Sequence, residues 1–489
     1  MLKGKVRAPE IDRPGLEWFN VERPLSLKDV EGKVVLLDFW TFCCINCIHV
    51  LPTLAILEEA FPEEVVVIGV HSPKFEAEKD SENLRQAISR YGITHPVIQD
   101  RDHVLWQQYA VRAWPTIVFI APDGSVLGQT SGEPSRDKLL RFVADLLQQA
   151  ASADQLRPSP LPLAPPPVPG GALSFPGKMR RLPGTSLWAL ADAGHNQIAL
   201  LDEEGEVVRR LGSGQQGFED GTAEEASFNA PQGLAYGDGV IYVADTGNHA
   251  IRRIDLETGT VETLAGTGAR GTILEGIGEA GTTALASPWD LAVAGEGVYF
   301  ANAGTHQIGV LDVFASTVYP IAGSGAEDIV DGPALEAALA QPSGLALSPD
   351  HGTLYFADSE TSSIRALGLR EPRMVSTLVG AGLFEFGHVN GPFESARLQH
   401  ALGVDLLPGG SPVVADSYNG ALRVLDLSAG EAADFDGGVY ACTDPVCIPA
   451  AEPAGVTVAE DGRVFLVDTN NHRVLVYHPD NRTYRTWAA

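Results

Sequence analysis

Residues 34–61 read VVLLDFWTFCCINCIHVLPTLAILEEAF and set the architecture of the N-terminal part. The first seven form a continuous apolar run, typical of a buried strand, and residues 47–61 have the spacing of an amphipathic helix. Further strands and helices alternate along the chain, with strands at 65–71 and 116–122 and helices at 81–92 and 136–150. Buried strands separated by helices predict an α/β domain with a central sheet.

Cys44 and Cys47 are separated by two residues at the start of the predicted helix. A helix N-terminus favours a thiolate on the first cysteine through its dipole and its unpaired N–H groups. The second cysteine lies one turn on, where it can close a disulfide and release a mixed-disulfide partner. A structural zinc site needs four ligands, and this part of the chain has no second ligand pair. We therefore expect neither a metal nor a cofactor.

Residues 148–172, QQAASADQLRPSPLPLAPPPVPGGA, are rich in proline. The prolines preclude both a helix and a sheet ladder and favour polyproline II, which acts as a semi-rigid spacer. Such a segment can hold two bodies apart or lie along one of them. We predict a first domain over residues 1–150, a linker over 151–171 and a second domain over 172–489.

The second domain repeats one pattern six times, as in IYVADTGNHAIRRID (241–255) and VYFANAGTHQIGVLD (298–312). An acid or amide marks the same place in each repeat: Asp192, Asp245, Asn302, Asp358, Asp416 and Asp468. With one strand before and one after, each unit has four strands. Six such units predict an all-β, six-bladed propeller, since no unit can bury both faces of its sheet alone. Because the first and last units are complete, we expect closure by packing between blades.

Long glycine-rich crossovers separate the units, and we expect them on one face of the propeller together with the turns inside the repeats. Long loops gathered on one face are where a propeller usually binds, so we expect this face to bind protein partners. His249, His306 and His472 follow their marker residue by four. We expect each acid and imidazole to bond backbone groups within its own blade, with no shared metal. His71, His95 and His103 belong to no recognisable motif.

The formal net charge is −29, and residues 151–489 hold 18 basic and 42 acidic residues. Nucleic acid and anionic membranes both require a basic surface, so neither is an expected partner. No apolar run is long enough to span a membrane, and the N-terminus has no secretory signal pattern. With only five cysteines in 489 residues, the chain is no disulfide scaffold. We expect a cytoplasmic protein.

Two motifs resemble known families. The pattern D-F-W-x-x-C-C-x-x-C at 38–47 resembles thioredoxin, and the insert between Val70 and Asp100 resembles its TlpA-like branch. Turns of the D-T-G-N-H kind resemble NHL repeats. Together the chain resembles the NHL-repeat-containing, thioredoxin-like protein family, which carries a Cys-Cys-Ile-Asn-Cys motif. The resemblance spans nearly the whole chain and implies thiol–disulfide chemistry.

The resemblance also implies roles for single residues. Cys44 would be the attacking thiol, Cys47 the resolving thiol, and Asp38 the buried carboxylate that takes the proton from Cys47. Pro52 matches the proline that kinks the helix. Pro115 matches the cis-proline that shapes the docking loop and keeps metal off the thiols.

Three departures from thioredoxin bear on these roles. Trp114 is bulkier than the usual residue before the cis-proline and would narrow the peptide-docking groove. The dipeptide Ile45-Asn46 replaces Gly-Pro, and this dipeptide tunes the redox poise, so the direction of electron flow stays open. Cys43 is an extra thiol, either a small buried hydrophobe or a third redox group.

Cys442 and Cys447 lie in the crossover between the fifth and sixth units. Their spacing permits a disulfide that closes a small loop, and two reduced thiols are the alternative. A sharper hypothesis is that the Cys44 site docks over this face and exchanges electrons with the pair.

These observations favour a thiol–disulfide oxidoreductase acting on protein or peptide disulfides, or on small thiols, with the propeller selecting the substrate or partner. One alternative is a non-enzymatic scaffold in which the thioredoxin-like part only docks. A second is a thiol peroxidase, because residues 41–44 match a T-x-x-C pattern, although Leu37 stands where that pattern has proline.

Overall fold

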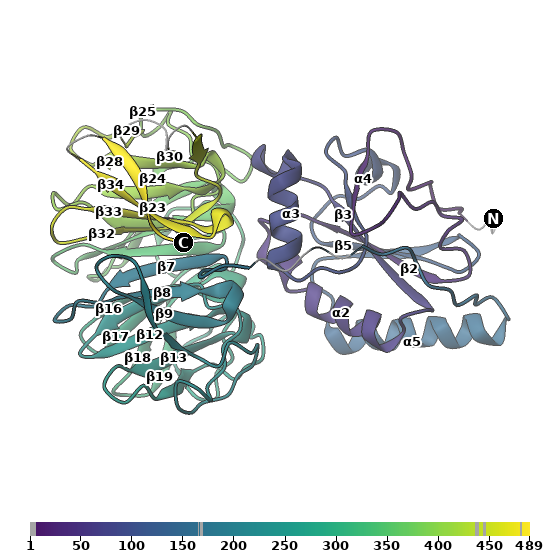
Figure 1. Ribbon diagram of the computed structural model, residues 1–489, viewed down its shortest axis with the longest axis horizontal. Coiled ribbons are helices and arrows are strands. Elements are labelled where there is room, and N and C mark those ends of the chain that lie inside the picture. Colours follow the sequence, from purple (N-terminus) through teal and green to yellow (C-terminus); the bar gives the residue numbers. More distant parts are fainter. Residues whose placement is uncertain (1–5, 165, 167–169, 436–439, 444–445, 480–481) are drawn as a thin grey trace. The chain divides into compact units, whose positions relative to one another are not determined.

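The computed structural model describes residues 6–164, 166, 170–435, 440–443, 446–479 and 482–489 (Figure 1). Residues 440–443 and 446–447 are described by their backbone alone. The chain divides into two units, Met1–Pro169 and Gly170–Ala489. No helix among the described residues has the length and apolar character needed to cross a membrane.

The first unit is built on a six-stranded sheet in the order β1-β4-β3-β2-β5-β6. The strands are β1 (Glu17–Phe19), β2 (Val34–Trp40), β3 (Val65–His71), β4 (Val97–Gln99), β5 (Thr116–Ile120) and β6 (Val126–Ser131). Central β2 runs parallel to β3 and antiparallel to β5 and is buried along its whole length. The α/β domain is confirmed, and the short strands β1 and β4 are additions that the sequence patterns did not reveal.

The helices are α1 (Ile45–Ile48), α2 (Leu51–Ala60), α3 (Ser81–Arg90), α4 (Val104–Gln108) and α5 (Arg136–Ser152), with a 3₁₀ turn η1 (Ala77–Lys79). The helix predicted over 47–61 is divided into α1 and α2, so a single continuous helix is wrong, whereas the kink expected at Pro52 is confirmed. Pro52 lies in the first turn of α2. Proline lacks an N–H, and its ring clashes with the carbonyl four residues earlier, so α1 ends at Ile48.

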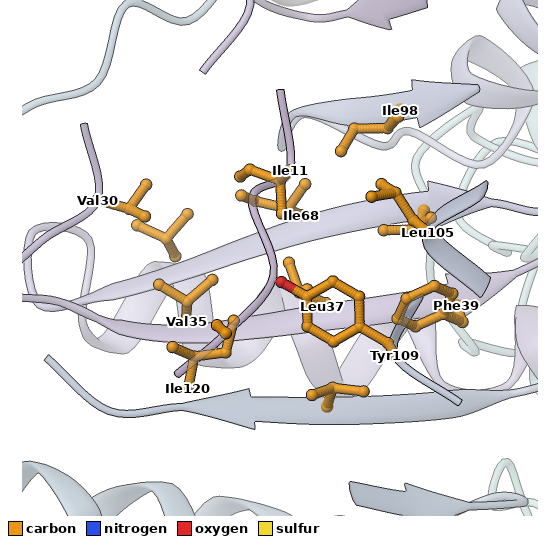
Figure 2. Packing of buried hydrophobic residues seen from close by; sticks show 14 of the residues in the cluster. Ile11, Val30, Val35, Leu37, Phe39, Ile68, Ile98, Leu105, Tyr109 and Ile120 are labelled. Carbon is orange, nitrogen blue, oxygen red and sulfur yellow. The ribbon is translucent and has the colours of Figure 1, made fainter. Parts of the chain in front are cut away.

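Side chains alternate between the two faces of β2, and each face has its own core. Val35, Leu37 and Phe39 pack against Ile11 of the N-terminal segment and Tyr109 after α4 (Figure 2). Val34 and Leu36 pack on the opposite face, against α2 and α5. Since alternation has a period of two, Asp38 lies on the α2 face, below the cysteine-bearing turn.

The described part of the linker lies along the first unit, which is the second of the two alternatives above. The backbone N–H of Arg157 donates to Gly32 O at 2.8 Å, and Leu163 forms an isolated bridge with Val21. Lys33 is buried and donates its Nζ to the carbonyl oxygen of Ser159.

The second unit is a six-bladed propeller, as predicted (Figure 1). Blade 1 consists of β7 (Pro176–Arg181), β8 (Trp188–Asp192), β9 (Gln197–Leu201) and β10 (Val207–Leu211), and blade 2 of β11 (Gly233–Gly237), β12 (Val240–Asp245), β13 (Ala250–Asp255) and β14 (Val261–Ala265). Blade 3 consists of β16 (Pro288–Ala294), β17 (Gly297–Asn302), β18 (Gln307–Asp312) and β19 (Thr317–Ala322), with β15 (Gly278–Glu279) at its edge. Blade 4 consists of β21 (Pro342–Leu347), β22 (Thr353–Asp358), β23 (Ser363–Gly368) and β24 (Met374–Val379), with β20 (Gly332–Pro333) at its edge.

The last two blades follow the same plan. Blade 5 consists of β26 (Gly403–Leu406), β27 (Pro412–Asp416), β28 (Ala421–Asp426) and β29 (Glu431–Asp434), with β25 (Gly391–Pro392) at its edge. Blade 6 consists of β32 (Pro453–Val458), β33 (Val464–Asp468), β34 (Arg473–His478) and β35 (Thr483–Ala488), extended by β30 (Tyr440–Thr443) and β31 (Val446–Pro449). Each blade completes its sheet from consecutive strands, and β32 packs against β7. Closure by packing between blades is therefore confirmed.

A residue in the left-handed region ends the 3₁₀ turn between the second and third strand of each blade. The turns are η2 (Ala193–His195), η3 (Thr246–Asn248), η4 (Ala303–Thr305), η5 (Ser359–Thr361), η6 (Ser417–Asn419) and η7 (Thr469–Asn471). Three of the residues that follow them are His249, His306 and His472, at φ of 52°, 55° and 53°.

These histidines connect neighbouring blades, so the prediction of bonds within one blade is wrong for the imidazoles. It is confirmed for the acids, as in Asp245, which accepts the N–H of Asn229. The Nδ1 of His249 accepts from the N–H of Ser287, which leads into blade 3, at 3.1 Å. The Nδ1 of His472 accepts from the N–H of Phe175 at 3.0 Å and so ties the last blade to the first. The left-handed backbone turns the imidazole towards the following crossover, which local spacing does not reveal.

The marker acids are buried and paired with arginine in most blades. Asp245 and Arg252 are both fully buried, with Oδ2 and Nη1 2.8 Å apart. Blade 3 differs at both places, because it has Asn302 for the acid and Gly309 at the arginine position. A Cβ on Gly309 would lie 2.3 Å from the Phe300 ring, so the ring leaves no room for a side chain at this position. Asn302 is therefore a neutral amide in the one blade that has glycine in place of the arginine.

We expect Asn302→Asp to destabilise the propeller, because it buries a carboxylate without a cation. The loss should be about 3–5 kcal/mol at pH 8 and should shrink towards pH 5 as the carboxyl protonates. Urea unfolding of the full chain at both pH values measures it. Asp358→Asn is the comparison variant, since it removes one of the two carboxylates that lie 2.9 Å from Arg365 and leaves the other, Asp331, in place, so no carboxylate is buried without a cation. Equal stability of Asn302→Asp and wild type at pH 8 would contradict the argument.

Candidate functional site

Cys44 is the N-cap of α1, and Cys47 lies in its first turn. The Sγ of Cys44 accepts the backbone N–H of Cys47 at 3.3 Å, so the sulfur receives one of the orphan donors of the helix end. No disulfide joins the two cysteines. Cys44 is partly exposed, whereas Cys47 is completely buried. A substrate can therefore reach Cys44 first, which is the order that the proposed roles require.

Asp38 is completely buried on β2, and neither of its carboxyl oxygens has a hydrogen-bond partner. Burial raises the pKa of Asp38 to about 7, and the nearby His95 acts in the opposite direction. Burial also raises the pKa of the Cys47 thiol, with further contributions from Cys44 and from the Asp38 carboxylate. The two acids therefore act on each other, because a negative charge on either disfavours a negative charge on the other.

The peptide bond between Trp114 and Pro115 is cis, as the resemblance implies. Trp114 donates its Nε1–H to the carbonyl oxygen of Ser72 at 2.9 Å, and its ring centroid lies 4.5 Å from that of Trp106. These contacts hold the indole in place beside the cis-proline, where it can narrow a docking groove.

Glu78 was not found from the sequence, although it supports the cysteine loop. Its Oε1 accepts the hydroxyl of Thr41 at 2.6 Å and the N–H of Cys43 at 3.0 Å. Its Oε2 accepts the N–H groups of Lys74 and Phe75 at 2.8 and 2.9 Å. Burial raises the pKa of Glu78, and these four hydrogen bonds oppose that rise. The only signal was its place in the TlpA-like insert, where it is one of several acids.

Two histidines outside any motif also lie in this region. The His71 ring stacks on Phe42 with centroids 5.1 Å apart, and burial lowers the pKa of His71 to about 3, so it is neutral. His95 donates to or accepts from Glu58 through Nδ1, 3.1 Å from the Glu58 Oε2. Cys43 is buried. The two histidines reach this region through the packing of distant segments, which no sequence motif indicates.

Cys442 and Cys447 are opposite each other in the antiparallel register of β30 and β31. Their side chains lie outside the described residues, so their disulfide and their electron exchange with Cys44 stay predictions. Within the described part of the chain, no group of three or more histidine, cysteine and acidic side chains is arranged to hold a metal ion.

Comparisons with known proteins agree with both folds. Residues 32–126 match the Thioredoxin-like family, and residues 228–254 and 451–477 match the NHL repeat. NHL repeat-containing protein 2 of Bos taurus is 38% identical over 517 residues, which cover 96% of this chain and 70% of that protein. Protein SUPPRESSOR OF QUENCHING 1, chloroplastic, of Arabidopsis thaliana is 40% identical over 485 residues, covering 93% of this chain and 45% of that protein. Thiol-disulfide oxidoreductase ResA of Bacillus anthracis is 29% identical over 117 residues, covering 24% of this chain and 65% of that protein.

Replacing Asp38 should stabilise the reduced protein at neutral and alkaline pH. The folded carboxyl titrates at about 7 and an unperturbed one at 3.8, so the folded state binds more protons in between and loses stability as the pH rises. Asp38→Asn removes this dependence and should be more stable than wild type at pH 8 by up to about 4 kcal/mol, with no gain at pH 4. Urea unfolding at the two pH values tests this, with the exposed Asp102→Asn as control. A less stable Asp38→Asn at pH 8 would refute it.

Proposed function

This chain belongs to the NHL repeat-containing protein 2 family, and we propose that it is a thiol–disulfide oxidoreductase whose propeller selects the substrate or partner. The observation that carries the proposal is the asymmetric pair at the start of α1. Cys44 is partly exposed and accepts a helix N–H, while Cys47 is buried one turn on, with Asp38 acting on its thiol. The 29% identity of the first unit to a thiol-disulfide oxidoreductase supports the same chemistry.

The reaction is a transfer of two electrons between sulfur atoms. The Cys44 thiolate attacks one sulfur of a substrate disulfide, and the other substrate sulfur leaves as a thiolate. Cys47 then passes its proton to Asp38 and attacks the Sγ of Cys44. The Cys44–Cys47 bond forms, the mixed disulfide breaks, and the second substrate sulfur leaves. The substrate is reduced and the dithiol is oxidised, and the reverse sequence oxidises a dithiol substrate.

The residues around the pair orient the substrate in this proposal. Pro115 shapes the docking loop, and Trp114, anchored on Ser72, narrows the groove beside it. A narrow groove favours an extended peptide or a small disulfide over a folded surface. Cys43 is buried behind the loop, which supports a packing role over a third redox role.

The propeller supplies partner selection in the proposal, since this fold is a common scaffold for binding proteins. Its crossover loops carry exposed apolar side chains, among them Ile277 at 75% and Phe384 at 68% exposure. The expected partner is a protein or peptide that carries a disulfide or dithiol. Location in the cytoplasm stays a prediction.

Single cysteine replacements test the proposal in the full chain. Cys44→Ser should abolish insulin reduction, because no attacking sulfur remains. Cys47→Ser should stop after the first step and accumulate a mixed disulfide with glutathione, visible by mass spectrometry. Cys43→Ser is the matched control and should retain turnover. A wild-type pair without a two-electron midpoint at any glutathione ratio would contradict the proposal and favour the scaffold alternative.

A further inference from the structure

The proposed reaction requires a proton to reach and leave the buried Asp38 carboxyl, and it does not say by which route. Its carboxyl gains a proton from Cys47 in one half of the cycle and must return one in the other half. The side chain is fully buried, and neither oxygen has a hydrogen-bond partner. The core on this face is apolar, including Leu36, Leu54 and Ile117. A proton therefore needs a polar route out of the core.

On the neighbouring strand β3, the residue beside Asp38 is a glycine, and polar side chains lie close to it. Gly69 of β3 pairs with Asp38 in the parallel register. A Cβ on Gly69 would lie 3.0 Å from the Nε1 of Trp40 and 3.4 Å from the Nε2 of His95. Both ring nitrogens are buried without a hydrogen-bond partner, as are the Asp38 oxygens. Unsatisfied buried polar groups are rare, and several of them gathered at one place call for a functional explanation.

The other side of His95 leads to solvent. Its Nδ1 lies 3.1 Å from the Oε2 of Glu58, whose side chain on α2 is 26% exposed, whereas the His95 side chain is 4% exposed. The backbone is fixed as well, because the His95 carbonyl accepts the side-chain amide of Asn20 at 2.9 Å. The imidazole thus has one nitrogen on the Asp38 side and one on a carboxylate that reaches water.

We infer that His95, held by Glu58, is a positioning residue that passes the Asp38 proton to and from solvent during the dithiol–disulfide cycle. This inference rests on the proposed function. When Cys47 becomes a disulfide, its proton moves to Asp38. Since no hydrogen bond joins Asp38 to the Nε2 of His95 in this structure, the proton then reaches Nε2 through a water molecule or a rotation of the carboxyl, while the proton on Nδ1 leaves through Glu58. When the disulfide is reduced, the same steps run in reverse, so His95 returns to its starting tautomer.

Few ionisable groups face this route in the described residues. Cys47 and His95 face Asp38, and His95 faces Glu58 on its other side. His95 lowers the pKa of Asp38 against the effect of burial, so the two side chains interact.

The test measures the protonation of Asp38 and the resolving step separately in the full chain. The infrared band of the protonated Asp38 carboxyl, assigned by its loss in Asp38→Asn, is followed against pH in the reduced protein. His95→Gln keeps a polar side chain but removes the imidazole that lowers the pKa of Asp38, so we expect the midpoint of the band to move up. Resolution of the Cys44–glutathione mixed disulfide should slow about ten-fold or more and lose its pH dependence between pH 6 and 8.

Two further variants sharpen the result. Glu58→Gln keeps a hydrogen-bond acceptor for Nδ1 and removes the charge, so it should shift both readouts in the same direction by less. His49→Gln is the matched control, because the Nδ1 of His49 lies 3.0 Å from Glu133 in another largely buried pair. It should leave the Asp38 midpoint unchanged.

The outcomes separate the relay from the proposed function. Normal resolution and an unshifted Asp38 midpoint in His95→Gln would overturn the relay alone, as would an equal shift in His49→Gln. A wild-type chain that never resolves the mixed disulfide would overturn the proposed function, and the relay with it. Slower resolution and a raised midpoint confined to His95→Gln and Glu58→Gln would support the relay.

Discussion

A carboxyl without hydrogen bonds in the middle of a buried strand is the constraint around which the first unit is arranged. Asp38 lies on β2, which has no exposed residue, and on the face covered by α2. Burying a polar group without a partner costs about 1–3 kcal/mol or more, so Asp38 lowers the stability of the folded protein. The carboxyl acts on the buried Cys47 thiol, and this pairing links the interior of the sheet to the partly exposed Cys44 at the helix end.

The local features of this site could be predicted from the sequence. The strand 34–40 is confirmed to the residue, the bond before Pro115 is cis, and six blades follow from a pattern that recurs six times. These features depend on neighbouring residues or on repetition. The break between α1 and α2 is local as well: the apolar spacing continues through Pro52, but proline interrupts the hydrogen-bond ladder, as expected of a kinking proline.

The rest of the site depends on contacts between distant parts of the chain. Glu78 reaches Thr41 and Cys43 across 37 and 35 residues, and His95 reaches Glu58 across 37. No spacing rule connects such positions. The repeat histidines were misassigned for the same reason, since His472 bonds to Phe175 across 297 residues, between the last blade and the first. A single sequence shows where chemistry-bearing residues stand, but only the fold shows which of them meet.

The two units treat buried carboxyls in opposite ways, and the difference separates structure from chemistry. Asp245 in the propeller accepts hydrogen bonds from Asn229, Asn248 and Arg252, so its oxygens are engaged and its charge is balanced. Burial raises the pKa of Asp245 as well, to about 6, but Arg252 and the hydrogen bonds oppose the rise, so this carboxylate mainly holds a turn in place. Asp38 has no cation bonded to it and no hydrogen bond, and burial raises its pKa to about 7. A carboxyl that can be neutral or charged near physiological pH can take up a proton from a neighbouring thiol and release it again. The lack of partners that makes Asp38 a poor structural element therefore suits it to proton transfer.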